Sequence, residues 1–176
     1  MKRAIRLALL AAGITGLSVA VAAAPADEFP EYRLKAAFVH NFIMFTEWPA
    51  ATGSVLNICI TGTDPFVSDI DALLGKTVGA RTLMVQRKSG GESLKACQVV
   101  YFSPSAIETL PRLVASLRGQ ATLTIADSPG AMRQGVALNM AVQRNKVSFE
   151  ANVLAARSAG LVLSSKLLRL ATEVEQ

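Results

Sequence analysis

The chain contains a single histidine, and its neighbours do not supply the other groups that metal binding or hydrolysis would need. His40 has no cysteine or acidic residue three or four positions further on, so a metal site there would have only one ligand. A Ser-His-Asp hydrolase would have to use the same histidine, and the chain has no Gly-x-Ser-x-Gly sequence. The sequence therefore predicts a structural histidine in a protein that is not an enzyme and carries no metal or cofactor.

Two aspartates each follow an apolar run that is typical of a buried strand, Asp64 after 55–61 and Asp127 after 121–126. Open α/β sheets bind ligands beyond the carboxyl ends of their strands, so these residues are candidates for a small-molecule site. Each aspartate is equally well placed to cap a following helix, and this interpretation is favoured. Gly62-Thr63-Asp64 lacks the glycine spacing and the lysine of a phosphate-binding loop, so no nucleotide is assigned.

The first 26 residues have the organisation of a cleaved signal peptide. Three cations precede an uncharged apolar run over 7–21, and small residues at processing positions follow it. We expect cleavage to leave a mature start at Ala24 or Asp27, with Asp27 preferred, and a single domain over 27–176. No cysteine lies at the cleavage point, so a soluble protein outside the cytoplasm is expected. An uncleaved anchor is the less favoured alternative.

Loss of the leader changes the charge balance. The whole chain has 18 cations and 13 acids, or +5, and the leader removes Lys2, Arg3 and Arg6 but no acid, which leaves 15 minus 13, or +2. Arg87-Lys88 is the only adjacent cationic pair left. Nucleic-acid binding therefore has little electrostatic basis.

Cys59 and Cys97 are the only two cysteines, and in an exported protein such a pair favours one disulfide. Cys59 lies in the first predicted strand of the sheet and Cys97 directly precedes a later one, so the bridge would join two neighbouring strands. A closed loop of about 40 residues is worth about 4 kcal/mol on chain-entropy grounds. A structural bridge and a redox-sensitive bridge both remain open.

The aromatic residues are concentrated in one predicted helix, Glu31 to Trp48. Six of the ten aromatic residues fall between 29 and 48. Leu34, Phe38, Phe42 and Phe45 follow one another along a single stripe at helical spacing. This helix either anchors the core or presents an exposed apolar face, and the core is favoured. Pro49 ends it.

The middle of the chain alternates between strands and helices. Strands are expected over 55–61, 98–102, 121–126 and, less clearly, 81–87. Helices are expected over 64–74 and 103–117, with one short helical turn ending near 135. Asp-Pro and Ser-Pro pairs start these helical segments, where a side-chain oxygen caps free amides and proline occupies the first turn. The nearly continuous apolar strands predict a parallel sheet covered on both faces.

The last third of the chain has a different pattern. Apolar and polar residues alternate over 136–143, and Arg144-Asn145 is a tight turn into 146–150. A helix over 151–159, an apolar 161–163 and a last helix through Ala171, capped by Ser164 or Ser165, follow. The predicted fold class is α/β, a three-layer sandwich whose mixed sheet has βα units and a C-terminal antiparallel edge hairpin.

Two stretches resemble the YfiR family: YRLKAAF at 32–38 running on to FTEWP at 45–49, and the segment 152–168 containing AARSAGLVLSSKLL. The middle is similar too, with ICITG at 58–62, DPF at 64–66, and Cys97 leading into VVYFS at 99–103. No single motif is diagnostic, but the ordered set covers nearly all of the expected mature chain. Members with a second cysteine pair near the C-terminal third are known, and this chain lacks that pair.

The resemblance implies a periplasmic repressor that binds the periplasmic part of an inner-membrane diguanylate cyclase and holds it inactive. It further implies that an outer-membrane lipoprotein can sequester the repressor, which frees the cyclase to raise cyclic di-GMP and promote biofilm formation. A homodimer is left open. The runner-up is a periplasmic sensor that binds a small molecule near Asp64 and Asp127 without catalysis.

The residues expected to contact the partner lie in the two stretches that carry the resemblance. They are Tyr32, Trp48, Asn152, Arg157, Ser164 and Lys166. For each one alone an ordinary structural role is favoured: Ser164 as a helix cap, Arg157 as a solvated charge and Trp48 as part of the core.

Overall fold

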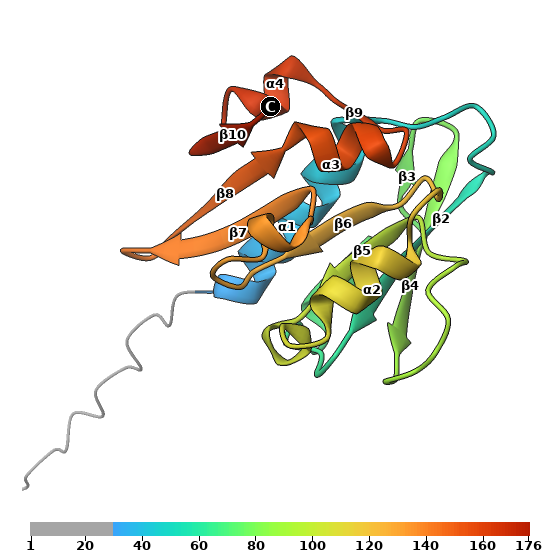
Figure 1. Ribbon diagram of the computed structural model, residues 1–176. Coiled ribbons are helices and arrows are strands. Elements are labelled where there is room, and N and C mark those ends of the chain that lie inside the picture. The colour runs from blue at the N-terminus through green and yellow to red at the C-terminus, as the bar shows by residue number, and fades with distance from the viewer. Residues whose placement is uncertain (1–29) are drawn as a thin grey trace, which may run out of the picture.

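An eight-stranded mixed sheet forms the centre of the molecule in the computed structural model, which describes residues 30–176 (Figure 1). The strand order is β10-β8-β7-β6-β5-β2-β4-β3. From β7 to β4 neighbouring strands are parallel, whereas β8 runs antiparallel to β7 and β3 antiparallel to β4. The bounds are β2 (Val55–Thr61), β3 (Thr77–Val78), β4 (Arg81–Lys88), β5 (Val99–Phe102), β6 (Leu123–Ala126), β7 (Leu138–Gln143), β8 (Lys146–Asn152) and β10 (Glu173–Glu175).

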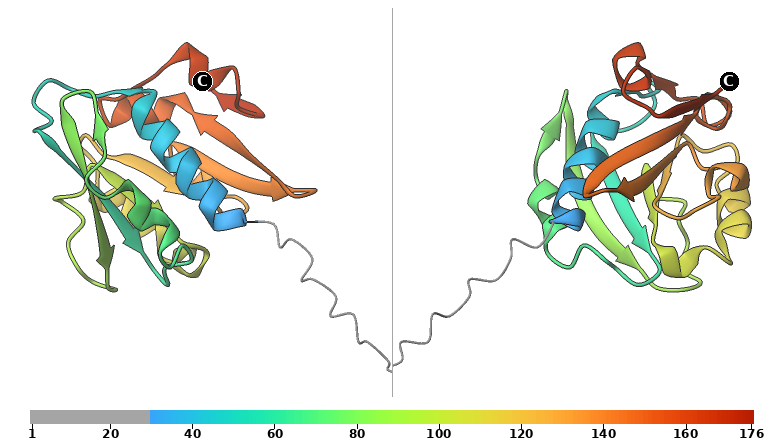
Figure 2. Two further views of the ribbon diagram at one scale, coloured as in Figure 1. Left: turned by 180° about the vertical axis from the view of Figure 1, so that it is seen from behind. Right: turned by 90° about the vertical axis from the view of Figure 1, so that its left-hand side faces the viewer.

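Helices cover the sheet on both faces, which makes three layers. Helix α1 (Glu31–Met44) lies across one face, and α2 (Leu110–Ser116) lies on the other (Figures 1 and 2). Alternate residues of β5 and β6 enter the two cores: Tyr101 and Ile125 face α1, whereas Phe102 and Ala126 face α2. The predicted α/β fold class with three layers and a mixed sheet is confirmed. Strands β5 and β6 are buried at every position, which explains their nearly continuous apolar sequences.

The buried face of α1 differs from the predicted stripe. Leu34 is 37% exposed, and Phe38 and Phe45 are only partly buried. Of the predicted stripe only Phe42 is fully buried, and it is joined by Lys35, Ala36, Val39 and Ile43, so the buried face is rotated by about one residue. The prediction followed the largest side chains, but the contact with the sheet favours the narrower face that includes Lys35.

Two predicted helices in the middle of the chain are shorter than expected, and the last helix, predicted through Ala171, ends at Leu168. The segment 64–74 contains only the 3-10 helix η1 (Asp69–Leu73), because Val67 has a positive φ of 54° that an α-helix does not allow. The segment 103–117 is divided into a 3-10 turn, η2 (Pro104–Ala106), and α2. Pro111 has no N–H to bond back to the preceding turn, so a continuous helix cannot cross it.

The C-terminal hairpin of β7 and β8 is confirmed. Arg144 and Asn145 have φ values of 51° and 58°, as a two-residue hairpin turn requires, and β8 continues to Asn152. Strand β10 lies beyond β8 and pairs with it in parallel, which the sequence pattern did not predict. Between β8 and β10 the chain forms α3 (Val153–Ser158), β9 (Val162–Leu163) and α4 (Ser165–Leu168). The short 3-10 helix η3 (Met132–Gln134) lies earlier, between β6 and β7.

The first helix ends earlier than Trp48 because the chain enters a second, two-stranded sheet. Strand β1 (Thr46–Glu47) pairs antiparallel with β9. The Thr46 hydroxyl donates to the Phe42 carbonyl at 2.6 Å, and the amide of Ser164 donates to the Phe45 carbonyl at 3.0 Å. The predicted leader, 1–26, lies outside the described residues. Within 30–176, none of the helices combines the length and apolar character that crossing a bilayer requires.

Candidate functional site

A buried ion pair joins α1 to the carboxyl end of β6. The Lys35 ammonium donates to the Asp127 carboxylate at 2.6 Å, and the two side chains are 4% and 1% exposed. Lys35 also pairs with Glu31 and lies 4.5 Å from the centroid of the Tyr32 ring. Because both charges are removed from water, their mutual attraction and hydrogen bonds must offset a large desolvation penalty. Asp127 therefore holds a helix against the sheet and does not cap a helix.

Two tyrosines surround the Asp127 carboxylate. The Tyr32 hydroxyl donates to Asp127 Oδ2 at 3.4 Å, and the buried Tyr101 hydroxyl has no hydrogen-bond partner within residues 30–176. Burial raises the pKa of both phenols, and the negative charge of Asp127 raises it further. Burial alone would lower the pKa of Lys35, but its bonds to Asp127 and Glu31 raise the pKa above the ordinary lysine value. The cluster thus consists of one buried cation, its carboxylates and neutral phenols.

Asp64, at the end of β2, is held by a cation from the neighbouring strand. Arg87 of β4 donates to Asp64 at 2.7 Å and to Asp71 at 2.7 Å, and it also donates to the Val67 carbonyl. The other Asp64 oxygen accepts from the amide of Phe66 at 2.8 Å. Arg87 therefore fastens the segment 64–71, including the strained Val67, to the sheet edge. Both aspartates that the sequence singled out have cationic partners within the protein.

Gly62 lets the ends of β2 and β5 come close together. It has a φ of +89°, and a Cβ there would lie 2.2 Å from the Ser103 Oγ and 2.6 Å from the Ser105 Oγ. These two hydroxyls are 2.9 Å apart, and Ser105 accepts from the amide of Thr63 at 2.8 Å. The crevice between β2 and β5 is therefore filled by side chains of the protein itself.

Substituting Gly62→Ala is expected to lower the free energy of unfolding by about 1–3 kcal/mol, because the new Cβ is strained in φ and collides with the serines. Urea denaturation with the disulfide intact measures this change. Gly53→Ala is the matched control, since nothing lies within 4 Å of the added Cβ. Equal stability of the two variants would show that the serines move aside without cost.

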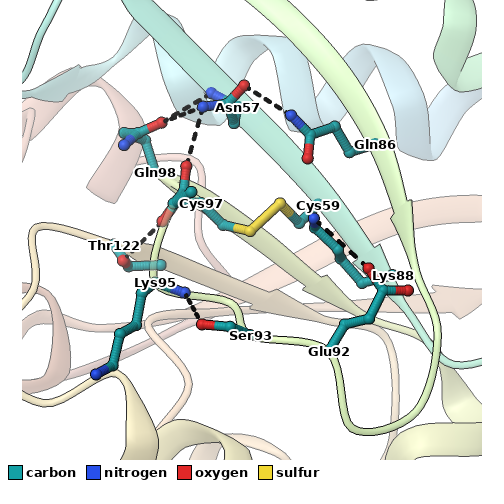
Figure 3. Close-up of a disulfide and its surroundings, with 11 residues drawn as sticks. Asn57, Cys59, Gln86, Lys88, Glu92, Ser93, Lys95, Cys97, Gln98 and Thr122 are labelled. Carbon is teal, nitrogen blue, oxygen red and sulfur yellow. Dashed lines mark hydrogen bonds and ion pairs between the residues drawn. A yellow bond between two sulfur atoms is a disulfide. The ribbon is translucent and has the colours of Figure 1, made fainter.

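Cys59 and Cys97 form a disulfide that joins β2 to the start of β5, the neighbouring strand (Figure 3). Their Cα atoms are 5.8 Å apart, and the residues are 0% and 1% exposed. The Cys97 carbonyl accepts from the Thr122 hydroxyl at 2.9 Å, and Asn57 donates to the Ala96 carbonyl at 2.9 Å. Thiol exchange needs an attacking thiolate to reach a sulfur, so burial favours the structural bridge over the redox-sensitive one.

The β1–β9 ladder places parts of the two resemblance stretches side by side. Glu47 lies opposite Val162, and a Cβ on Gly160 would lie 3.9 Å from Pro49. Trp48 is partly buried, and its indole N–H donates to the Ile43 carbonyl at 3.3 Å. Lys166, which is exposed, belongs to α4 directly after β9. Four of the six residues expected to contact a partner therefore lie in or next to the elements of this end: Trp48, Arg157, Ser164 and Lys166.

The other two expected contact residues have structural partners elsewhere. Tyr32 lies at the opposite end of α1, against Asp127 and edge-on to Phe66. Asn152 is buried, caps α3 by accepting from the Ala155 amide at 2.7 Å, and donates to Glu175 at 2.8 Å. Ser164 likewise caps α4 by accepting from the Leu167 amide at 3.2 Å.

Sequence reasoning did not single out Lys35 or Arg87. Lys35 shares a helical face with Val39 and Phe42, so a cation on the apolar face was the signal that a buried carboxylate should be sought. Arg87 gave no comparable signal, because its pairing with Asp64 depends on the β2–β4 register. Among residues 30–176 no group of His, Cys, Asp and Glu could hold a metal ion. Burial and nearby Lys76 lower the pKa of His40.

The fold and these sites define a three-layer α/β domain whose polar clusters are engaged in holding its elements together. The model of the YfiR/HmsC-like family matches residues 32–172, so the chain belongs to that family. Among solved structures it is similar to a conserved domain protein from Vibrio cholerae O1 biovar El Tor strain N16961, with a TM-score of 0.56 and 8% identity. The match covers 82% of this chain but only 60% of the Vibrio chain, and at this identity it shows the fold alone. No curated protein matches the chain.

Proposed function

We propose that the protein is a periplasmic regulator that binds the periplasmic part of an inner-membrane diguanylate cyclase and represses it, lowering cyclic di-GMP and biofilm formation. Membership in the YfiR/HmsC-like family over residues 32–172 carries this proposal, since at the family level it supports a periplasmic regulator of a diguanylate cyclase. The buried disulfide supports it, because such bridges persist in oxidising compartments. An outer-membrane lipoprotein that sequesters the protein is the proposed means of release.

The contact surface that we propose is the end of the molecule built around the β1–β9 ladder. Two apolar side chains are exposed there, Met44 at 45% and Val162 at 53%. Arg157 and Lys166 are exposed nearby and form no ion pair within residues 30–176. Apolar residues flanked by free cations suit a partner surface with an apolar centre and acidic rim. Asn152, Ser164 and Tyr32 act indirectly in this proposal, by holding α3, α4 and α1.

Repression requires differential binding. The regulator must bind the inactive conformer of the cyclase more tightly than the active one, and each tenfold preference is worth about 1.4 kcal/mol. A ligand with equal affinity for both conformers would shift nothing, however tightly it bound. Affinity alone is therefore an insufficient test, and the cyclase output must be measured with it.

The proposal is tested in a strain that lacks this protein. Cyclic di-GMP should rise in the deletion strain and return to its original level when the wild-type chain is supplied. The tagged protein should also co-purify with a membrane diguanylate cyclase after cross-linking in intact cells. Unchanged cyclic di-GMP in the deletion strain would contradict repression, whatever the protein binds.

The surface is tested by the double variant Arg157→Glu/Val162→Glu. We expect binding to the periplasmic domain of the co-purified cyclase to weaken at least about tenfold, because a cation is reversed and an apolar contact is lost. The measurement is titration calorimetry, with cyclic di-GMP as the cellular readout. Arg112→Glu, an exposed arginine on α2, is the matched control and should repress normally. Full repression by the double variant would remove this surface from the proposal.

A further inference from the structure

A groove lies on the sheet face opposite α1, between α2, η3 and α3. Its volume is about 810 Å³, within the range of small-molecule sites in proteins. Thr122, just before β6, and Thr124, in β6, both line the groove. The groove is therefore on the α2 face of the sheet and not at the carboxyl edge, where Asp127 lies. The sequence-based expectation of a ligand near Asp64 and Asp127 therefore concerned a different part of the fold.

The walls of the groove are largely apolar and aliphatic. Val114 and Leu117 of the α2 segment line one side, and Leu154 and Ala155 of α3 line the other. Leu154 is 51% exposed, although its neighbour Val153 is buried. Among residues 30–176 no aromatic side chain lines the groove, so these residues offer a flat ring no stacking partner. The shape and lining favour a flexible aliphatic body.

The polar groups of the groove are cationic or neutral. Arg118, after α2, and Arg133, in η3, both line it, and no acidic residue of the described segment 30–176 does. Neither arginine forms an ion pair in the described part of the chain. Gln134 also lines the groove, and its side-chain oxygen is buried without a hydrogen-bond partner. The hydroxyls of Thr122 and Thr124 are already bonded to backbone groups.

We propose that this groove binds a free aliphatic monocarboxylate of medium chain length. A guanidinium matches a carboxylate in shape and charge, and two unpaired guanidiniums beside an uncharged aliphatic channel select a negative head on an apolar tail. Burial of the tail against the four aliphatic side chains supplies the favourable apolar contact. The inference does not depend on the proposed cyclase partner, because Arg118 and Arg133 lie outside the proposed contact surface.

Titration calorimetry on the full mature chain tests the proposal, with decanoate as the probe below its critical micelle concentration. We expect saturable binding of decanoate and none of acetate, which lacks the tail, or of decyltrimethylammonium, whose head has the opposite charge. The variant Arg118→Glu/Arg133→Glu should weaken decanoate binding at least about tenfold. Ala115→Trp, which places a bulky side chain in the groove from an exposed position, should also weaken it.

Arg112→Glu/Arg169→Glu controls for the change in net charge, since it reverses two exposed arginines that do not line the groove. Unchanged melting temperatures would show that the variants are folded. If a variant did melt early, the comparison of decanoate with decyltrimethylammonium on the wild-type protein would still decide the head-group charge. Equal binding of the two amphiphiles, wild-type affinity in the double arginine variant, or binding to phosphatidylglycerol vesicles but not to decanoate would each overturn the proposal.

Discussion

Substituting Lys35→Met should lower the free energy of unfolding by about 3–5 kcal/mol, because it leaves a carboxylate without its cation in the protein interior. The Asp127 side chain is 1% exposed, and Lys35 lies 2.6 Å from it. Methionine retains most of the aliphatic volume, so the loss reports the charge and not a cavity. Guanidinium or urea denaturation, monitored by the fluorescence of the single tryptophan, Trp48, measures it.

The matched control is Arg33→Met, which breaks an exposed ion pair on the same helix. Arg33 and Asp69 are 3.6 Å apart with side chains 77% and 35% exposed, so the change should cost at most about 1 kcal/mol. The double variant Lys35→Met/Asp127→Leu should recover much of the loss, since no buried charge is then unpaired. A single variant as stable as Arg33→Met would show that the buried Asp127 side chain does not depend on the Lys35 cation for its stability.

The sign of the pH dependence follows from the raised pKa of Lys35. A lysine whose pKa is higher in the folded state contributes its full stabilisation at neutral pH, below its unfolded pKa of about 10.4. That contribution is lost as the pH rises through the folded pKa. The difference in stability between the wild type and Lys35→Met should therefore shrink as the solution becomes strongly alkaline.

Removing the disulfide with Cys59→Ala/Cys97→Ala should cost about 4 kcal/mol, because it releases a loop of 38 residues in the unfolded chain. Loss of the buried sulfur contacts adds to this cost, since both cysteines are in the core on the α2 face of the sheet. The measurement is denaturant unfolding of the double variant beside the oxidised wild type. Wild-type protein reduced under denaturing conditions should be less stable than the oxidised protein but more stable than the double variant, because it keeps the buried sulfur atoms.

The rate of reduction under native conditions distinguishes a structural bridge from a redox-sensitive one. Because both sulfurs are buried, reduction by dithiothreitol should proceed only as fast as the protein opens. The structural bridge predicts that a low concentration of denaturant accelerates the reaction strongly. Rapid reduction of the fully folded protein would instead identify a bridge that responds to the redox state of its surroundings.

Much of the sheet could be predicted because its signals are local. The apolar run Val55–Thr61 forms β2 with the predicted bounds, and the strand predicted over 98–102 differs from β5 by one residue. Alternation of side chains, with Arg144-Asn145 between the two strands, predicted the β7–β8 hairpin. In each case the burial of the strand or the geometry of the turn constrains consecutive residues. A local sequence pattern is therefore enough to predict these elements.

The candidate sites could be predicted only in part. Asp64 and Asp127 were correctly placed at the carboxyl ends of strands, because a residue that follows a strand in the sequence lies at the carboxyl end of that strand. Their partners, Arg87 and Lys35, come from 23 and 92 residues away along the chain. Pairings at such separations depend on register and helix rotation, which no local pattern specifies.

Local patterns were enough to predict the class of fold, the βα order, the hairpin and the two cysteines available for a bridge, since each depends on neighbouring residues. Four features were visible only in the folded chain: the buried face of α1, the pairing of β1 with β9, the extension of the sheet by β10, and the position of the groove with Arg118 and Arg133. These features arise where segments far apart in the chain meet. Packing, desolvation of charge and strand register depend on these long-range contacts. They select among arrangements that the local sequence leaves equally allowed.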